Sequence, residues 1–142
     1  MKLHLSSPGD ARVSLEPRDG LQRFFVEKLA PLTTRDETRA YIAGVCSLMA
    51  PRADLSQASL VLHCAAVQES NEFEDWVSLG DWILWAGAWA PQSLVEPQLA
   101  LSIGSMAYAR CHRLMQSWAL FDELSSSLPR VIAQTRFLLS HR

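Results

Sequence analysis

The chain has 142 residues, of which 49% belong to the hydrophobic class and 20% are charged, and its formal net charge is −2. This composition is typical of a globular protein and excludes collagen-like, disulfide-scaffold and disordered chains. The near balance of acidic and basic side chains gives no electrostatic reason to expect nucleic-acid binding.

The N-terminal residues 1–18 carry two prolines and a glycine among few apolar side chains, and we expect an irregular arm there. They contain no apolar run of the length that a signal peptide requires, which argues against export. A short helix is expected from Asp19 or Gly20 to Pro31. Its predicted apolar stripe comprises Leu21, Phe24, Phe25 and Leu29.

Two further helices are expected before residue 69. Thr33 or Thr34 would cap the first, whose early carboxylates suit the positive end of the helix dipole. Pro51 ends this helix, and Asp54 or Ser56 would cap the second. The predicted inner face of the first comprises Tyr41, Val45, Leu48 and Met49.

The C-terminal half predicts a long helix over 72–90 with Asn71 as its cap, and then a helix from Pro97 to about Met115. Two segments, 118–127 and 129–140, follow, and Pro129 either begins the last helix or kinks a single long one. The most apolar stretch, 76–90, is shorter than the roughly twenty residues of a membrane-spanning helix, so we expect a buried core helix. The predicted inner face of the last segments comprises Leu128, Val131, Ile132, Thr135, Leu138 and Leu139.

Helical spacing recurs from residue 20 onward, and no stretch shows the sustained alternation of a half-buried strand. The sequence contains no internal repeat and no long linker. We therefore expect an all-α fold, a single-domain bundle of six or seven helices over residues 19–142 that follows the arm 1–18. Three cysteines without a CxxC spacing indicate reduced thiols and a cytoplasmic setting, and no membrane association is predicted.

The longest apolar helix places Trp82, Trp85 and Trp89 at i, i+3 and i+7, so that three indoles share one face. Such a face either lines a ligand or partner site or fills the core or a homodimer seam. Asp81, in the same stretch, is either a tuned acid or base or a structural carboxylate that pairs with an arginine or a tyrosine hydroxyl. The candidate ligand- or partner-binding residues are Trp82, Trp85, Trp89, Asp81, Tyr108 and Arg110.

Two adjacent His-Cys pairs lie on different predicted helices, and one member of each could meet across a helix interface. Together with a carboxylate they would form a mixed nitrogen, sulfur and oxygen metal shell. No HxxxH, ExxH or CxxC spacing accompanies them, and the alternative is buried thiols with half-exposed imidazoles. The candidate metal ligands are His63, Cys64, Glu69, Cys111 and His112.

The stretch LGDWILWAGAWAP at 79–91 and the following IGSMAYAR at 103–110 resemble a GDW-x-L…G…P…G-x-x-A-Y pattern of uncharacterised helical bacterial proteins. The resemblance covers about thirty residues. It implies an all-helical, cytosolic bacterial domain and carries no catalytic residue. The matching positions are Asp81, Gly87, Pro91, Gly104 and Tyr108.

The sequence contains no GxGxxG, GxxxxGK[ST] or GxSxG motif, so no cofactor is predicted and nothing supports an enzyme. Residues 54–109 contain seven acids and no Lys or Arg, so their charges face solvent, the basic flanks or another molecule. We therefore expect a non-enzymatic protein that binds another protein or itself as a homodimer, through the Trp-rich face or this acidic middle. The alternative is a small-molecule or metal-binding bundle, with a catalytic role open, whose Trp-rich helix forms a pocket wall. Nucleic-acid regulation would require one exposed face formed by Arg110, Arg113, Arg130 and Arg136.

Overall fold

The computed structural model describes residues 20–51, 64–94, 96–115 and 119–140. The predicted all-α fold is confirmed, since these residues are mostly helical and include no strand. A helical turn covers residues 64–67. The elements are α2 (Gly20–Lys28), α3 (Asp36–Met49), α5 (Phe73–Trp89), the 3-10 helix η1 (Pro91–Ser93), α6 (Pro97–Met115) and α7 (Ala119–Ser140).

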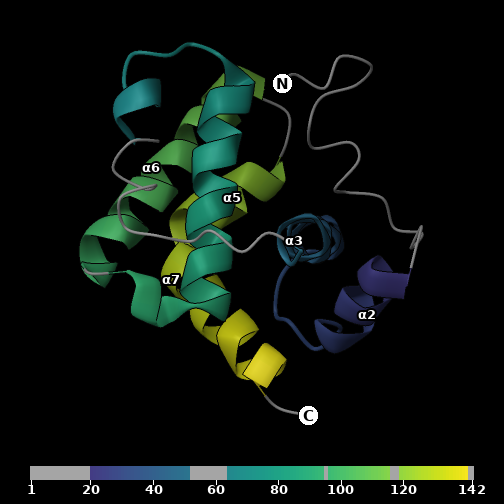
Figure 1. The fold of residues 1–142 in the computed structure, drawn as a ribbon. Coiled ribbons are helices and arrows are strands. Elements are labelled where there is room, and N and C mark those ends of the chain that lie inside the picture. The colour runs from purple at the N-terminus through teal and green to yellow at the C-terminus, as the bar shows by residue number, and fades with distance from the viewer. Residues whose placement is uncertain (1–19, 52–63, 95, 116–118, 141–142) are drawn as a thin grey trace.

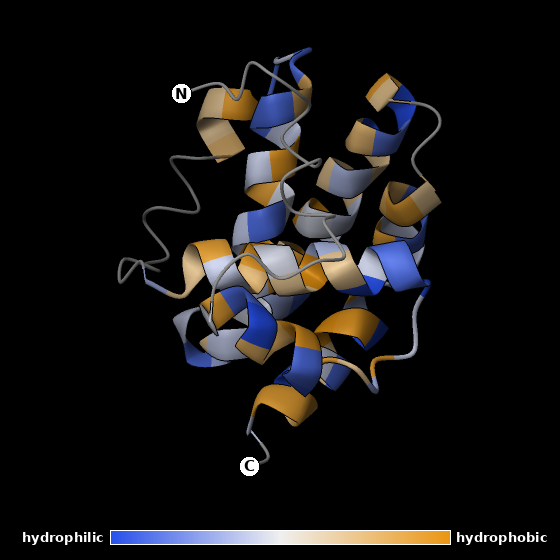
Figure 2. Cartoon of the chain, turned by 90° about the vertical axis from the view of Figure 1, so that its right-hand side faces the viewer, coloured by the Kyte–Doolittle hydropathy of each residue, from blue (hydrophilic) through white to orange (hydrophobic). Residues whose placement is uncertain are grey.

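Helix α5 lies at the centre of the bundle. It packs against α6 and α7 along its length and also contacts α3, while α2 packs on α3 at the edge (Figure 1). Apolar and hydrophilic residues alternate along most of the helices, as Figure 2 shows. The apolar residues of several helices therefore meet in one core around α5.

The predicted buried core helix is confirmed in α5, where twelve of 17 residues are buried. Polar residues are confined mainly to its first turn, which contains Glu74 and Asp75. A helix that is apolar on all sides requires neighbours on all sides, and α3, α6 and α7 supply them. Among the described residues, no helix is both long and apolar enough to cross a membrane.

Glycines bring α5, α6 and α7 into close contact. A Cβ atom at Gly80 would lie 2.8 Å from the ring of Tyr108, and one at Gly104 would lie 2.7 Å from Leu128 and 2.9 Å from Ile83. These distances are shorter than real Cβ contacts, so a larger residue at either position would force the neighbouring side chains to shift. Gly80 thereby allows the Tyr108 ring to lie directly against the backbone of α5.

The predicted caps of two helices are wrong. Arg35, and neither Thr33 nor Thr34, is the N-cap residue of α3. Its backbone N–H donates to Glu123 Oε1 of α7 at 3.2 Å, because the preceding turn packs on α7. For α5 the N-cap residue is Glu72 instead of Asn71.

Ser70 replaces the missing side-chain cap at the start of α5. Its hydroxyl accepts from the Glu72 N–H at 2.9 Å and donates to Asp75 Oδ2 at 2.6 Å. One serine thus satisfies a backbone donor and holds a carboxylate near the positive end of the helix. A cap residue can be replaced in this way whenever the loop path carries another hydroxyl to the same place.

The predicted stripes of α2 and α3 are only partly correct. In α2, Phe25 is buried, whereas Leu21 and Phe24 are exposed because this edge helix packs mainly on α3. In α3, Leu48 is 45% exposed. The face that packs inward comprises Thr38, Tyr41, Ile42 and Val45.

The C-terminal helix α7 consists of two helical segments that meet at a kink, as both alternatives for Pro129 predict. Ser127 has non-helical dihedral angles within α7, two residues before Pro129. The ring of a proline inside a helix clashes with the carbonyl group one turn earlier, so the helix bends there. Four of the predicted inner residues are fully buried, namely Leu128, Val131, Ile132 and Thr135. The N-terminal arm and most of the helix expected after Asp54 or Ser56 lie outside the described residues.

Candidate functional site

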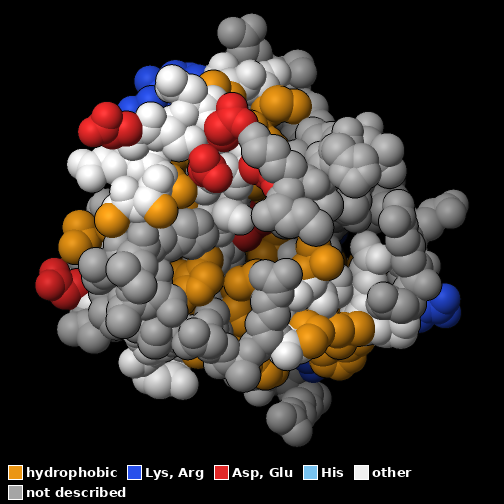
Figure 3. All heavy atoms as spheres, turned by 45° about the horizontal axis from the view of Figure 1, so that its top comes forward, with side chains coloured by type: hydrophobic (Ala, Val, Ile, Leu, Met, Phe, Trp, Pro, Cys, Tyr) orange, Lys and Arg blue, Asp and Glu red, His pale blue; other side chains and the backbone are white. Residues whose placement is uncertain are grey.

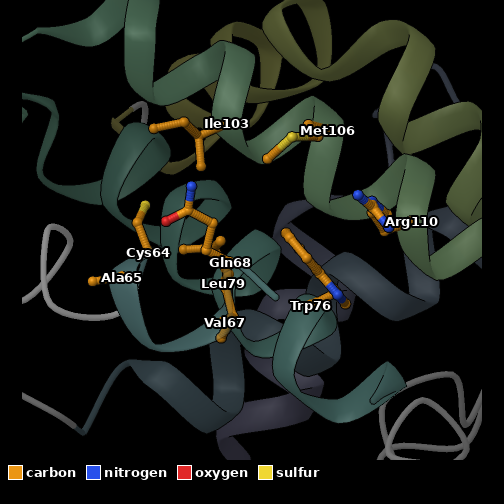
Figure 4. Close-up of a pocket in the computed structure, with 9 residues that line it drawn as sticks. All are labelled: Cys64, Ala65, Val67, Gln68, Trp76, Leu79, Ile103, Met106 and Arg110. Carbon is orange, nitrogen blue, oxygen red and sulfur yellow. The ribbon is translucent and has the colours of Figure 1, made fainter. Parts of the chain in front are cut away.

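An open cavity of about 590 Å³ lies between α5, α6 and residues 64–68 (Figure 4). Its volume falls within the range of roughly 300–1,000 Å³ of small-molecule sites. Helical spacing assembles the walls, because i, i+3 and i+7 positions of α6 and i, i+3 positions of α5 share a face. The lining residues are Cys64, Ala65, Val67, Gln68, Trp76, Leu79, Ile103, Met106 and Arg110.

The cavity is apolar apart from Gln68 and Arg110. Arg110 lies over the indole of Trp76, with its guanidinium carbon 5.2 Å from the ring centroid. The indole is fixed in turn, because its Nε1–H donates to the Ser70 carbonyl oxygen at 2.9 Å. The Nε atom of Arg110 is buried and has no hydrogen-bond partner within the part of the chain that the structure describes.

The N-terminal end of α5, which we call the α5 entrance, is acidic, as the sequence predicts. Glu74 and Asp75 lie in its first turn, and Figure 3 shows acidic side chains gathered beside exposed apolar ones on this face. Since carboxylates stabilise a helix N-terminus, the acids have a structural role there. None of them lines the cavity.

Behind the cavity, Asp81 is the centre of a buried polar cluster. Its Oδ1 accepts a hydrogen bond from the Tyr41 hydroxyl at 2.6 Å and from the Tyr108 hydroxyl at 2.7 Å. The cluster joins α3, α5 and α6. Phe121 of α7 packs edge-on against the Tyr41 ring and stacks on the Tyr108 ring.

The Tyr108 hydroxyl and two nearby thiols keep their protons at neutral pH. Burial raises the pKa of Tyr108 well above its ordinary value, and the negative charge of Asp81 raises it further. Burial, with a smaller contribution from Asp81, likewise raises the pKa of Cys46 and of Cys111. At neutral pH the tyrosine therefore donates, and both thiols stay protonated and poorly nucleophilic.

The three predicted tryptophans of α5 lie apart from the cavity. Trp82 and Trp85 are buried in the core, and Trp89 is 53% exposed and stacks on Trp85 with ring centroids 5.1 Å apart. The neighbouring helices cover most of α5, so the same face that carries the indoles also fills the core. Their part in binding a ligand or partner stays a prediction.

The other candidates fall into two places. Asp81 and Tyr108 meet in the buried cluster, whereas Arg110 lines the cavity. Two further arginines donate hydrogen bonds to backbone carbonyl oxygens: Arg130 to that of Thr33, and Arg136 to that of Gly87.

A metal site finds no support in the described residues, which contain no group of three or more His, Cys, Asp or Glu able to hold an ion. His63 lies outside them. Cys64 lines the cavity, Cys111 is buried near Asp81, Glu69 is exposed and His112 is half-buried.

Sequence reasoning did not assign Tyr41, Trp76 or Met106 to a site. Tyr41 was expected on an inner face, but its hydrogen bond to Asp81 joins residues 40 positions apart in the sequence. Helical periodicity predicts which face of a helix is buried, and it does not predict contacts between separate helices. The available signal for the cavity was the spacing of Ile103, Met106 and Arg110 on one face of α6.

Comparisons of the chain with protein-family models, with curated proteins and with solved structures find no match.

Proposed function

We propose that the protein binds a small apolar molecule in the cavity between α5, α6 and residues 64–68. The observation that carries the proposal is a cavity of about 590 Å³ with a nearly continuous apolar lining. Burying an apolar ligand there would remove both surfaces from water, which contributes roughly 25 cal/mol for each Å² of apolar area. The protein would act as a binding protein, without a catalytic step.

The rigidity of the walls supports this proposal. Trp76 is held by its hydrogen bond to the Ser70 carbonyl oxygen, and Leu79 is fully buried on the adjacent turn. Tyr108, packed against Gly80 and bonded to Asp81, holds α5 and α6 in register behind the cavity. A preformed site loses less conformational entropy when its ligand binds.

The test uses the neutral probe N-phenyl-1-naphthylamine, whose fluorescence rises in an apolar site. We expect saturable binding to the protein and a loss of at least about tenfold in affinity for Met106→Trp, because the larger side chain fills the cavity. Leu99→Trp is the matched control, since Leu99 is a similarly exposed residue of α6 that does not line the cavity. Absence of saturable binding, or equal losses in both variants, would refute the proposal; circular dichroism verifies folding.

Self-association is a second candidate, favoured by an aromatic run whose two end rings, Phe24 and Trp89, are exposed and whose two middle rings, Phe25 and Trp85, are buried. Phe24 and Trp89 are each about half exposed, and ring contacts through Phe25 and Trp85 connect them. Exposed aromatic side chains are candidate contact sites, because aromatic residues are enriched at protein–protein interfaces.

The partner proposed for this run is a second copy of the chain. Arg23 and Glu27 flank Phe24 on the exposed side of α2, and in an antiparallel two-fold pair each would face its opposite charge. Sedimentation velocity should then detect a dimer that Trp89→Ser converts to monomer. Leu99→Ser, at an equally exposed site of α6, should leave the dimer intact. A wild-type monomer at high concentration would exclude this candidate.

A reducing, cytoplasmic setting is also proposed for the protein. Cys46 and Cys111 are buried free thiols, and Cys64 is a third free thiol. Free thiols of this kind persist where glutathione and thioredoxin keep cysteines reduced.

A further inference from the structure

Among the described residues that line the cavity, one is charged, and it has no carboxylate partner within that part of the chain. That residue is Arg110 of α6. Within the described residues its interaction is the stacking on Trp76, and its buried Nε donates to no acceptor. A guanidinium at an apolar wall without a counterion carries a desolvation cost that a bound anion would offset.

The other lining residues that the structure describes carry no negative charge. Burial raises the pKa of the Cys64 thiol, which stays neutral at pH 7. The Gln68 amide can donate a hydrogen bond but carries no charge. The acids in the first turn of α5, Glu74 and Asp75, are not among the described lining residues.

We infer that the ligand is an apolar molecule with a single carboxylate, which pairs with the guanidinium of Arg110 while its hydrocarbon body fills the cavity. The inference rests on the proposed function. One cation matches one negative charge, and the planar fork of a guanidinium suits the two oxygens of a carboxylate. The Trp76 ring beneath Arg110 holds the fork flat without using its donors.

Three probes with the same ten-carbon chain test the inference: decanoate, decanol and decylamine, each displacing N-phenyl-1-naphthylamine below its micellar concentration. We expect decanoate to bind roughly tenfold or more tightly than decanol, as a charge-assisted hydrogen bond adds to the same apolar burial. Decylamine should bind more weakly than decanol, because its ammonium group faces Arg110.

Arg110→Gln should remove the preference for decanoate over decanol and leave the affinity for decanol within about threefold, which shows that the cavity persists. Arg110→Lys should restore part of the preference, since it retains the charge without the fork. Arg113→Gln is the control, because Arg113 is an exposed residue of the same helix outside the cavity lining.

The outcomes separate the two proposals. Equal affinities for decanoate and decanol, or a preference for decanoate that survives Arg110→Gln, would overturn the carboxylate inference while the binding function stands. Tighter binding of decylamine would also overturn it and would assign the acids at the α5 entrance to recognition. If neither the neutral probe nor any of the three chains binds, both the function and the inference fail.

Discussion

Asp81 makes the polar contacts in the core on which the packing of three helices depends. Tyr108→Phe would remove one of the two hydroxyl donors to a buried carboxylate. We expect the free energy of unfolding to fall by about 1.5–3 kcal/mol, because hydrogen bonds to charged groups have this magnitude. Urea denaturation measures the change.

Tyr41→Phe should cost a similar amount, since the Tyr41 hydroxyl donates to the same oxygen. A double-mutant cycle then reports how strongly the two donors are coupled. Losses below about 0.5 kcal/mol for both variants, the range of ordinary surface substitutions, would mean that the cluster contributes little to stability.

Gly80→Ala tests the close contact between α5 and α6. Helix propensity alone would favour alanine by about 1 kcal/mol. The new Cβ would lie 2.8 Å from a ring that the hydrogen bond to Asp81 holds in place, and overpacking of this kind costs about 1–3 kcal/mol. We therefore expect net destabilisation in thermal or urea unfolding. Gly20→Ala, where no atom lies within 4 Å of the added Cβ, is the control and should not destabilise.

The sequence predicted what kind of side chain could contact Asp81, but not which residues would do so. One alternative drawn from the sequence, a hydrogen bond to a tyrosine hydroxyl, is confirmed twice over at Tyr41 and Tyr108. Which tyrosine reaches the carboxylate depends on how α3 and α6 cross α5. For α6 the close contact of Tyr108 with Gly80 is part of that crossing, and one-dimensional spacing does not encode the angle at which helices cross.

At the scale of elements, the start of α6 at Pro97 was predicted correctly, because proline at a first helical position is a strong signal. The caps of α3 and α5 were wrong for a common reason. The Thr33 hydroxyl accepts a hydrogen bond from Gln134 of α7, and the Ser70 hydroxyl, in place of the Asn71 side chain, accepts from the backbone at the start of α5. Polar side chains in turns have several possible partners, and tertiary packing selects among them.

The turn before α3 is held by α7. Gln134 accepts from the Thr33 N–H at 3.2 Å and donates to its hydroxyl at 2.9 Å. Gln134→Ala should release this turn and raise the hydrogen-exchange rate of the Thr33 amide by roughly fivefold, with a loss of at most about 1 kcal/mol in global stability. Gln98→Ala, at an exposed glutamine of α6, should leave the Thr33 amide unchanged. An unchanged rate in Gln134→Ala would show that the backbone alone orders the turn.

At the scale of the whole molecule, the fold class followed from helical periodicity, whereas the cavity did not. Its walls join Cys64, Trp76 and Arg110, which lie on three separate segments. Trp82 and Trp85 fill the core, because α5 has neighbours on nearly every side, whereas Trp89 at the end of α5 is half exposed. An aromatic stripe indicates burial reliably, but only the packing of the other helices decides which of its members border an open space.

The protonation states of the core predict how stability depends on pH. Burial raises the pKa of both Cys46 and Cys111 above the ordinary value of 9.0 in the folded protein. The unfolded chain therefore releases these protons first, and the free energy of unfolding falls as pH rises above about 9, by about 1.4 kcal/mol per pH unit for each thiol. From about pH 10 the raised pKa of Tyr108 adds a loss of the same sign.

Urea denaturation in the presence of reductant between about pH 7 and 10.5 measures this slope. Cys46→Ala should lower stability at pH 7 through the lost packing of a fully buried side chain, yet flatten the alkaline slope by about 1.4 kcal/mol per pH unit. Cys64→Ala, whose thiol is only half-buried, should change the slope less. If Cys46→Ala and the wild type lose stability equally above pH 9, the buried thiols do not govern alkaline unfolding. The exposed surface of the bundle would then have to supply the titrating groups.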